Sequence, residues 1–327
     1  MDDVRAFIDA FEAFGRHLAA VSWSALVLAL ACHFLRLAAR VRGWQNILAA
    51  AYPGARVPFK GIFGAYWAGV AVNAITPARG GDVVKLYLAR HRVAGSSYPT
   101  LGSTLVVETL FDFCLATVLL LVALQQGLLP GLPDLPSIPA FDWSFAVAHP
   151  RLAAFLFSVL VAAAILGFVW ASGHVVAFKE KVKRGFVILG DRSLFLEQVV
   201  SWQALSWVFR IGSVYFFLEA FNIPATFDTV LAVLVVGGLA TTLPFTPGGA
   251  GTQQAVLVFA LAGWASSSAV LSFSVGMQLA TVALNAAVGF GAIALMLGTV
   301  RWREIVRRDG GPTSEPAAAP SRPTPRA

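Results

Sequence analysis

Residues 229–300 read TVLAVLVVGGLATTLPFTPGGAGTQQAVLVFALAGWASSSAVLSFSVGMQLATVALNAAVGFGAIALMLGTV and contain no Asp, Glu, Lys or Arg. A helix needs about 20 mostly apolar residues to cross the hydrocarbon core of a bilayer, so this tract is long enough for roughly three passes. A soluble domain of this size needs a charged surface to stay dissolved. The sequence therefore predicts an all-α, polytopic integral membrane protein.

The rest of the chain supports this fold class, because 57% of its residues are hydrophobic and only 13% are charged. The net charge of +7 comes from basic residues at the ends of apolar segments. That placement is what membrane topology requires, so it does not indicate a nucleic-acid partner. The two cysteines, Cys32 and Cys114, fall inside predicted spans, and no spacing of ligands suggests a metal site. We expect no metal and no other cofactor.

Hydropathy divides the chain into one transmembrane domain, residues 1–305, and a disordered tail, residues 306–327. The domain has two halves, about 18–126 and 152–300. An amphipathic helix is expected before residue 18, and its acidic residues do not fit a cleaved signal peptide. The apolar segments are expected at about 18–37, 61–75, 100–124, 152–172, 199–218, 229–243, a stub ending at Gly263, and 269–297.

Lys and Arg in short loops predict the orientation of the spans. The basic stretches near 36–60, 85–92, 179–192 and 301–308 are assigned to the cytoplasm, and those near 127–150 and 222–228 to the outside. This predicts a multi-pass protein of the cell membrane with a cytoplasmic C-terminus. Segment 61–75 should then enter from the inside and return, whereas the 229–263 pair should enter from the outside and return.

The two re-entrant segments carry similar interruptions, ITPARGG at 75–81 and FTPGGAG at 245–251. Proline ends a helical hydrogen-bond ladder, and glycine permits backbone geometries that a helix cannot adopt. Such backbone is tolerated at membrane depth only inside protein or beside a water-filled cavity. Matched breaks in two inverted halves point to a transporter's central site, so we expect the breaks to meet near the midplane. Alternatively, both breaks merely end helices at the interface.

Charged residues near the first break are candidates for binding a lipid head group. Asp82 should lie near a helix start, where free N–H groups suit an anion, and Arg79 and Lys85 add cationic donors. The alternative is that both cations flank the membrane and Lys85 pairs locally with Asp82. The candidate binding residues here are Pro77, Arg79, Gly80, Gly81, Asp82 and Lys85.

A second group of candidates lies inside the spans. Glu108 and Asp112 are four residues apart on one helix face, where a carboxylate usually finds a partner in the bundle interior. Arg210, within another span, is the expected partner, unless it contacts a bound lipid phosphate. The pair is then either a gate or a structural salt bridge. Amides in apolar context are expected to join helices by hydrogen bonds; they are Asn73, Gln253, Gln254, Gln278 and Asn285.

Three ordered motifs resemble the lysylphosphatidylglycerol synthase transmembrane region, a family of flippase-like domains. They are TPARGGDVVK at 76–85, ETLFD at 108–112 and LPFTPGGAG at 243–251. The resemblance implies movement of a polar-headed lipid or lipid-linked molecule between leaflets, with membrane lipids as partners. It adds the residues of the second break to the candidate substrate-binding set, namely Pro247, Gly248, Gly249, Gly251 and Gln254.

The chain departs from the family pattern at four positions. Asp82 stands where the family usually has Glu, Lys85 where it has Arg, Thr109 where it has Arg, and Gln254 where it has Glu. Loss of the last carboxylate argues against proton coupling there. The synthase domain of longer relatives is absent, and no nucleophile or ATP-binding motif occurs, so we do not expect an enzyme. A non-transporting scaffold for lipid or envelope biosynthesis is the alternative function.

Overall fold

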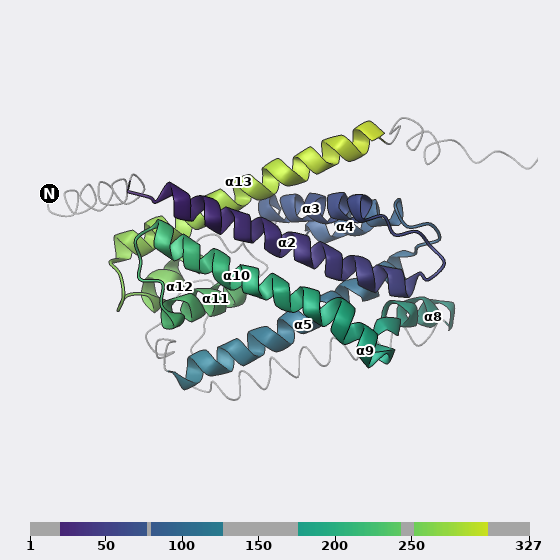
Figure 1. Cartoon of the computed structure of the whole chain (residues 1–327), viewed down its shortest axis with the longest axis horizontal. Coiled ribbons are helices and arrows are strands. Elements are labelled where there is room, and N and C mark those ends of the chain that lie inside the picture. Colours follow the sequence, from purple (N-terminus) through teal and green to yellow (C-terminus); the bar gives the residue numbers. More distant parts are fainter. Residues whose placement is uncertain (1–19, 77–79, 127–175, 243–251, 300–327) are drawn as a thin grey trace, which may run out of the picture.

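The computed structural model describes residues 20–76, 80–126, 176–242 and 252–299, and these residues form an α-helical bundle (Figure 1). The predicted all-α class is confirmed. The helices are α2 (Trp23–Ala51), α3 (Phe59–Ile75), α4 (Gly80–Arg90), α5 (Tyr98–Gln125), α8 (Val176–Gly185), α9 (Arg192–Phe195), α10 (Ser201–Ala220), α11 (Phe227–Thr242), α12 (Thr252–Ala260) and α13 (Ser267–Thr299), with a 3₁₀ turn at Val187–Gly190 and a π turn at Leu196–Val200.

Helices α2, α5 and α13 are long and apolar enough to cross a membrane. Their outward side chains are apolar and exposed, for example Val27, Leu121 and Leu279 at 63%, 55% and 65%. In water such a surface would drive association, whereas acyl chains solvate it. The predicted spans 100–124 and 269–297 are confirmed as helices α5 and α13, and the segment predicted at 199–218 is α10.

Helix α2 does not end near residue 37, as the sequence suggested, but continues to Ala51. Arg36 and Arg40 were assigned to a cytoplasmic basic stretch, and they lie instead inside this helix. The helix expected to start near Asp82 is α4, and it extends to Arg90, so it contains Lys85 and Arg90 of the basic stretch near 85–92. The end of α2 was misplaced because charge alone does not reveal that a cation such as Arg40 has buried carboxylate partners.

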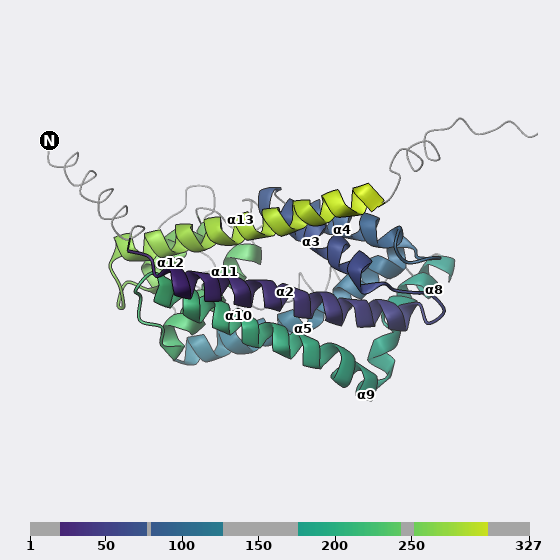
Figure 2. The same ribbon diagram turned by 45° about the horizontal axis from the view of Figure 1, so that its top comes forward.

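Helices α2 and α10 pack side by side and antiparallel along most of their length (Figures 1 and 2). At one end the Ser213 hydroxyl donates to the carbonyl of Ala29 over 3.0 Å. At the other end the Asn46 amide donates to the carbonyl of Gln198 over 2.7 Å. These bonds fix the register of the two helices.

Helices α3 and α4 form a tight hairpin held by glycine contacts. A Cβ atom on Gly81 would lie 1.9 Å from the carbonyl oxygen of Gly69, so only glycine permits this approach. The Gly81 N–H donates to the Asn73 side chain over 2.7 Å. Helix α13 packs on α3 in the same manner, since a Cβ on Gly289 would lie 2.3 Å from the Ala71 methyl group. The chain therefore turns back after α3; that the hairpin enters and leaves the bilayer at one face stays a prediction.

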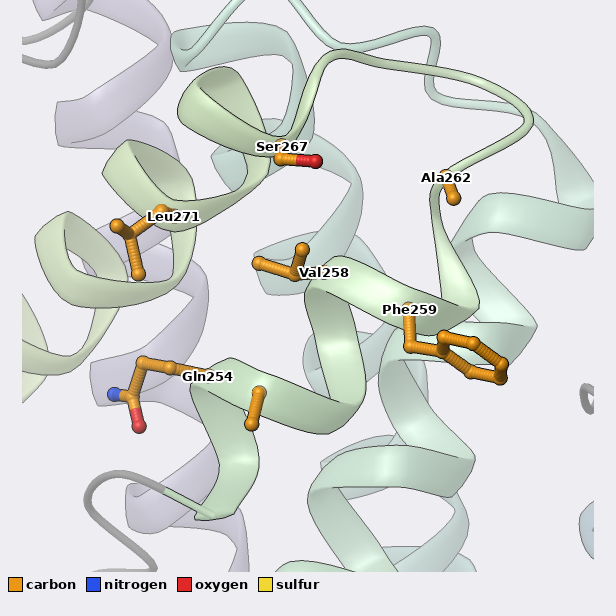
Figure 3. A pocket seen from close by; sticks show the side chains of 7 residues that line it. Gln254, Val258, Phe259, Ala262, Ser267 and Leu271 are labelled. Atoms are coloured by element: carbon orange, nitrogen blue, oxygen red, sulfur yellow. The ribbon is translucent and has the colours of Figure 1, made fainter. Parts of the chain in front are cut away.

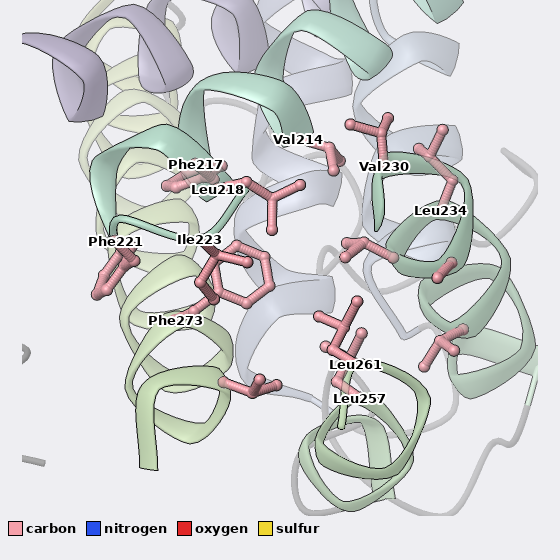
Figure 4. Packing of buried hydrophobic residues seen from close by; sticks show 14 of the residues in the cluster. Val214, Phe217, Leu218, Phe221, Ile223, Val230, Leu234, Leu257, Leu261 and Phe273 are labelled. Atoms are coloured by element: carbon pink, nitrogen blue, oxygen red, sulfur yellow. The ribbon is translucent and has the colours of Figure 1, made fainter. Parts of the chain in front are cut away.

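A large apolar core lies at the other end of the bundle, among α10, α11, α12 and α13 (Figure 4). Phe217, Ile223, Leu257 and Phe273 are at most 2% exposed there. Helices α11 and α12 form a second hairpin beside this core. Its connection holds Pro247, Gly248, Gly249 and Gly251, which lie outside the described residues.

Several other sequence predictions fall outside the described residues. They are the amphipathic helix before residue 18, the residues Pro77 and Arg79, the loop 127–150, the span 152–172 and the tail 306–327. The expected meeting of the two Pro-Gly breaks therefore stays a prediction, and so does the inverted repeat.

Candidate functional site

The Glu108 carboxylate is the centre of a buried charge network. Its side chain is 2% exposed and lies on the inner face of α5. One oxygen accepts from the Lys85 ammonium at 2.8 Å. The other accepts from the Arg40 guanidinium at 2.9 Å and from the Tyr66 hydroxyl at 2.6 Å. Four helices, α2, α3, α4 and α5, each contribute one side chain to these bonds, so the carboxylate ties them together.

Lys85 lies within this network and does not reach toward the membrane surface. It is 5% exposed, and its ammonium lies over the rings of Tyr66 and Trp44, 3.7 and 4.2 Å from their centroids. Cation–π contacts of this kind are strongest where water is excluded. The alternative of a membrane-flanking Lys85 with a local Asp82 pair is therefore wrong. Asp82 does lie in the first turn of α4, as expected, and its carboxylate accepts from Asn73 at 3.2 Å.

Asp112, one turn beyond Glu108, completes the charge network, which we define as Arg40, Tyr66, Lys85, Glu108 and Asp112. Its carboxylate accepts from a second nitrogen of Arg40 and, over 2.8 Å, from the indole N–H of Trp207. One guanidinium thus bridges two carboxylates whose separation matches one helical turn. Arginine suits this role because its donors are arranged in a rigid fork.

The predicted ion pair between Arg210 and the carboxylates is wrong within the described chain, where Arg40 and Lys85 provide the ion pairs. The Arg210 guanidinium instead lies 4.5 Å from the centroid of the Trp207 ring. The sequence did contain a signal for the correct partner. Arg36 and Arg40 share the four-residue spacing of Glu108 and Asp112, which indicates a second charged helix face, although Arg40 alone bonds both carboxylates.

Arg36 lies one turn before Arg40 on the same face of α2. Its Nε atom is buried and has no hydrogen-bond partner in the part of the chain that is described. One further turn along, His33 bonds to Asn285 of α13 at 3.0 Å. The polar side chains of α2 therefore form a track from Trp44, bonded to Thr104 at 3.1 Å, to His33.

The amides were predicted to join helices, and four of the five predicted positions do so. Asn73 links α3 to α4, Asn285 links α13 to α2, and Gln254 links α12 to Gln278 of α13. Gln254 also borders an open pocket of about 590 Å³ that is otherwise lined mainly by apolar side chains, including Val258, Phe259 and Leu271 (Figure 3). No member of the charge network lines this pocket.

A bundle with apolar outer surfaces around a buried charge network defines a polytopic helical membrane protein. The model of the family described as the lysylphosphatidylglycerol synthase TM region matches residues 6–289. The chain belongs to this family. No curated protein matches the chain.

Proposed function

We propose that the protein moves a polar-headed lipid, or a lipid-linked molecule, between the two leaflets of the cell membrane. The observation that carries this proposal is the buried charge network at the junction of α2, α3, α4 and α5. An ionised side chain is costly in a hydrocarbon environment, and one that is kept within a span is by default a candidate for a substrate or ion pathway. Membership of a membrane family with flippase-like relatives supports the same function.

The polar track on α2 has a length suited to this task. From His33 to Trp44 the helix rises by about 16 Å, at about 1.5 Å per residue. That is about half of a hydrocarbon core roughly 30 Å thick. A head group on this track would exchange water for fixed charges, while its acyl chains stay against the apolar outer surface. The barrier that a head group meets in pure lipid is thereby lowered.

The two hairpins, α3–α4 and α11–α12, are the proposed moving or gating elements. In this proposal they enter the membrane from opposite faces, and their Pro-Gly connections, with Pro77, Arg79 and Pro247, border the substrate. The sequence has no ATP-binding motif, so transport follows a lipid gradient or is coupled to an ion gradient.

A transport assay tests the proposal. The protein is reconstituted into liposomes whose lipids carry a fluorescent acyl chain and different head groups, and an impermeant quencher reports which leaflet each lipid occupies. Without transport, the quencher reaches only the lipids of the outer leaflet. We expect the protein to bring the lipids of the inner leaflet within reach as well, for at least one head group. Glu108→Gln should slow this transfer between leaflets. Arg42→Gln is the matched control, because Arg42 lies on the exposed face of α2 and, among the described residues, bonds to Gln45 alone, at 2.6 Å.

No transport of any head group by folded protein would reject the proposal in favour of a scaffold. Native mass spectrometry of lipids that co-purify with the protein would identify the head groups to include first.

The orientation has its own test. Cysteines introduced at Ser137 and Ser314 should react differently with an impermeant thiol reagent in intact cells, with labelling at Ser137 alone. Labelling at Ser314 alone would show that the C-terminus is outside.

A further inference from the structure

Two arginines beside the charge network, Arg36 and Arg210, differ from the cations inside it. Arg40 and Lys85 are each bonded to a carboxylate. Among the described residues, neither Arg36 nor Arg210 has an ion pair within 4.0 Å. The carboxylate that attracts both arginines, Asp112, is already bonded to Arg40 and to the indole N–H of Trp207.

The register of α2 and α10 places these two arginines together. Ser213 bonds to Ala29, and a Cβ on Gly212 would lie 3.4 Å from the sulfur of Cys32. Because the helices run antiparallel, Arg210 lies about opposite His33 and thus within about one turn of Arg36. The positive charge of Arg210 acts on Arg36, and both guanidiniums are attracted by the carboxylate of Asp112.

Two positive charges within about one helical turn repel each other, which raises the free energy of the folded protein. A buried donor without an acceptor raises it further. The Nε atom of Arg36 is such a donor. The Arg210 guanidinium lies over the Trp207 ring, 4.5 Å from its centroid, a contact that does not use its N–H donors as hydrogen bonds. The structure thus holds two neighbouring guanidiniums that have no ion pair within 4.0 Å among the described residues.

Resting on the proposed function, we propose that Arg36 and Arg210 together bind the phosphate group of a phosphate-bearing lipid. A phosphate offers several charged oxygens and can accept from two guanidinium forks at once. An uncharged sugar head group would leave the excess positive charge unbalanced. The site is distinct from the Arg79 and Lys85 pair expected from the sequence, because the Lys85 ammonium is bonded to Glu108.

Binding, measured without transport, tests this site. The detergent-solubilised protein is titrated with phosphatidic acid, and with diacylglycerol of the same acyl chains, and bound lipid is counted by native mass spectrometry. We expect phosphatidic acid to bind at least about tenfold more weakly to Arg36→Gln and to Arg210→Gln, since a hydrogen bond to a charged group contributes about that much. Binding of diacylglycerol should not change. Arg36→Lys, which keeps the charge but not the fork, should show a smaller loss.

Arg42→Gln is the control on the same helix and should bind phosphatidic acid as the parent does. Thermal melting in detergent checks that each variant is folded; if a Gln variant is not, the Lys variants at the two positions carry the comparison. Inorganic phosphate is added as a competitor. If millimolar phosphate displaces phosphatidic acid, the site binds the free phosphate ion. If phosphatidic acid stays bound, the site is specific for the lipid. Unchanged phosphatidic acid affinity in the folded variants would overturn the proposal.

The outcomes separate this inference from the proposed function. Loss of binding in the variants, together with no transport by the parent protein, would leave a phosphate site in a protein that is not a translocase. Transport by the parent together with unchanged binding in the variants would leave a translocase whose head-group site lies elsewhere.

Discussion

The α3–α4 hairpin and the α11–α12 hairpin resemble each other in sequence at their Pro-Gly connections but differ in charge. The first brings Lys85 into the interior, where its ammonium bonds to Glu108 at 2.8 Å. The second brings in an uncharged amide, Gln254, which bonds to Gln278. Similar breaks therefore do not imply similar chemistry: the charged interactions belong to the first hairpin, and the second contributes polar contacts without ionisable groups at this position.

Among the substitutions that compare the two hairpins, removal of Lys85 should lower the free energy of unfolding the most. Lys85→Met leaves Glu108 buried with Arg40 and Tyr66 as its only described partners, and breaking a buried ion pair costs about 3–5 kcal/mol. Unfolding of the detergent-solubilised protein, followed by helical circular dichroism, measures the loss. Lys85→Met with Glu108→Gln should be less destabilised than the two single losses added together. Strict additivity would contradict the direct pair.

Disruption of the glycine contact between α3 and α4 should cause the second largest loss of stability. Gly81→Ala places a methyl group 1.9 Å from the Gly69 carbonyl oxygen, so the helices must separate. Overpacking of this kind costs about 1–3 kcal/mol. Gly102→Ala is the matched control, because a Cβ there, in helix α5, meets nothing within 4 Å. We expect Gly102→Ala to be neutral or slightly stabilising, and equal melting temperatures for the two variants would contradict the tight hairpin.

A double-mutant cycle distinguishes Arg40 from Arg210 as the partner of Asp112. Arg40→Met and Asp112→Asn should couple by about 1–2 kcal/mol, within the range for residues in contact. Arg210→Met and Asp112→Asn should couple more weakly, because Asp112 is bonded to Arg40 and Trp207 while its attraction to Arg210 acts over a longer distance. Stronger coupling through Arg210 than through Arg40 would reverse this assignment. Thermal unfolding in one detergent serves for both cycles.

A substitution in the second hairpin, α11–α12, should change the free energy of unfolding the least. Gln254→Leu removes a neutral interhelical hydrogen bond, and such bonds contribute about 0.6 kcal/mol in membrane proteins. The expected shift in unfolding free energy is therefore several times smaller than for Lys85→Met. Gln278→Leu, which removes the other partner of this bond, should give a similar value. A loss as large as that of Lys85→Met would abolish the contrast between the hairpins.

The sequence predicted the fold well wherever hydrophobic length decides the structure. Helices α5 and α13 begin and end within a few residues of their predicted bounds. Helix α13 lies in a tract without charged residues, and the only charged residues in α5 are the acidic pair Glu108 and Asp112. The end of α2 was missed because Arg36 and Arg40 look like interfacial charges until their partners are known. Pairing depends on the register between helices, and one sequence does not contain that register explicitly.

The candidate site was predicted in part for the same reason. Glu108 and Asp112 were recognised because carboxylates are conspicuous within an apolar span. Their cation was misassigned to Arg210, since Arg210 also lies within a span whereas Arg40 seemed to lie beyond one. Tyr66 and Trp207 gave no signal at all, because aromatic side chains are common in membrane helices and only the bonds to Glu108 and Asp112 distinguish these two.

The glycine contacts have a mechanical consequence. Backbone touching backbone leaves no room to slide, so α3, α4 and α13 should move as one rigid body. Helices α2 and α10, joined by the hydrogen bonds of Ser213 and Asn46, should move as another. The contacts between these bodies include long side chains, such as Arg40 on Tyr66 and His33 on Asn285. Long side chains can swing and exchange partners while helices rotate, which tightly packed glycines cannot do. The charge network is thus placed where a hinge would be, and distances between spin labels on α3 and α10 would report whether that hinge opens.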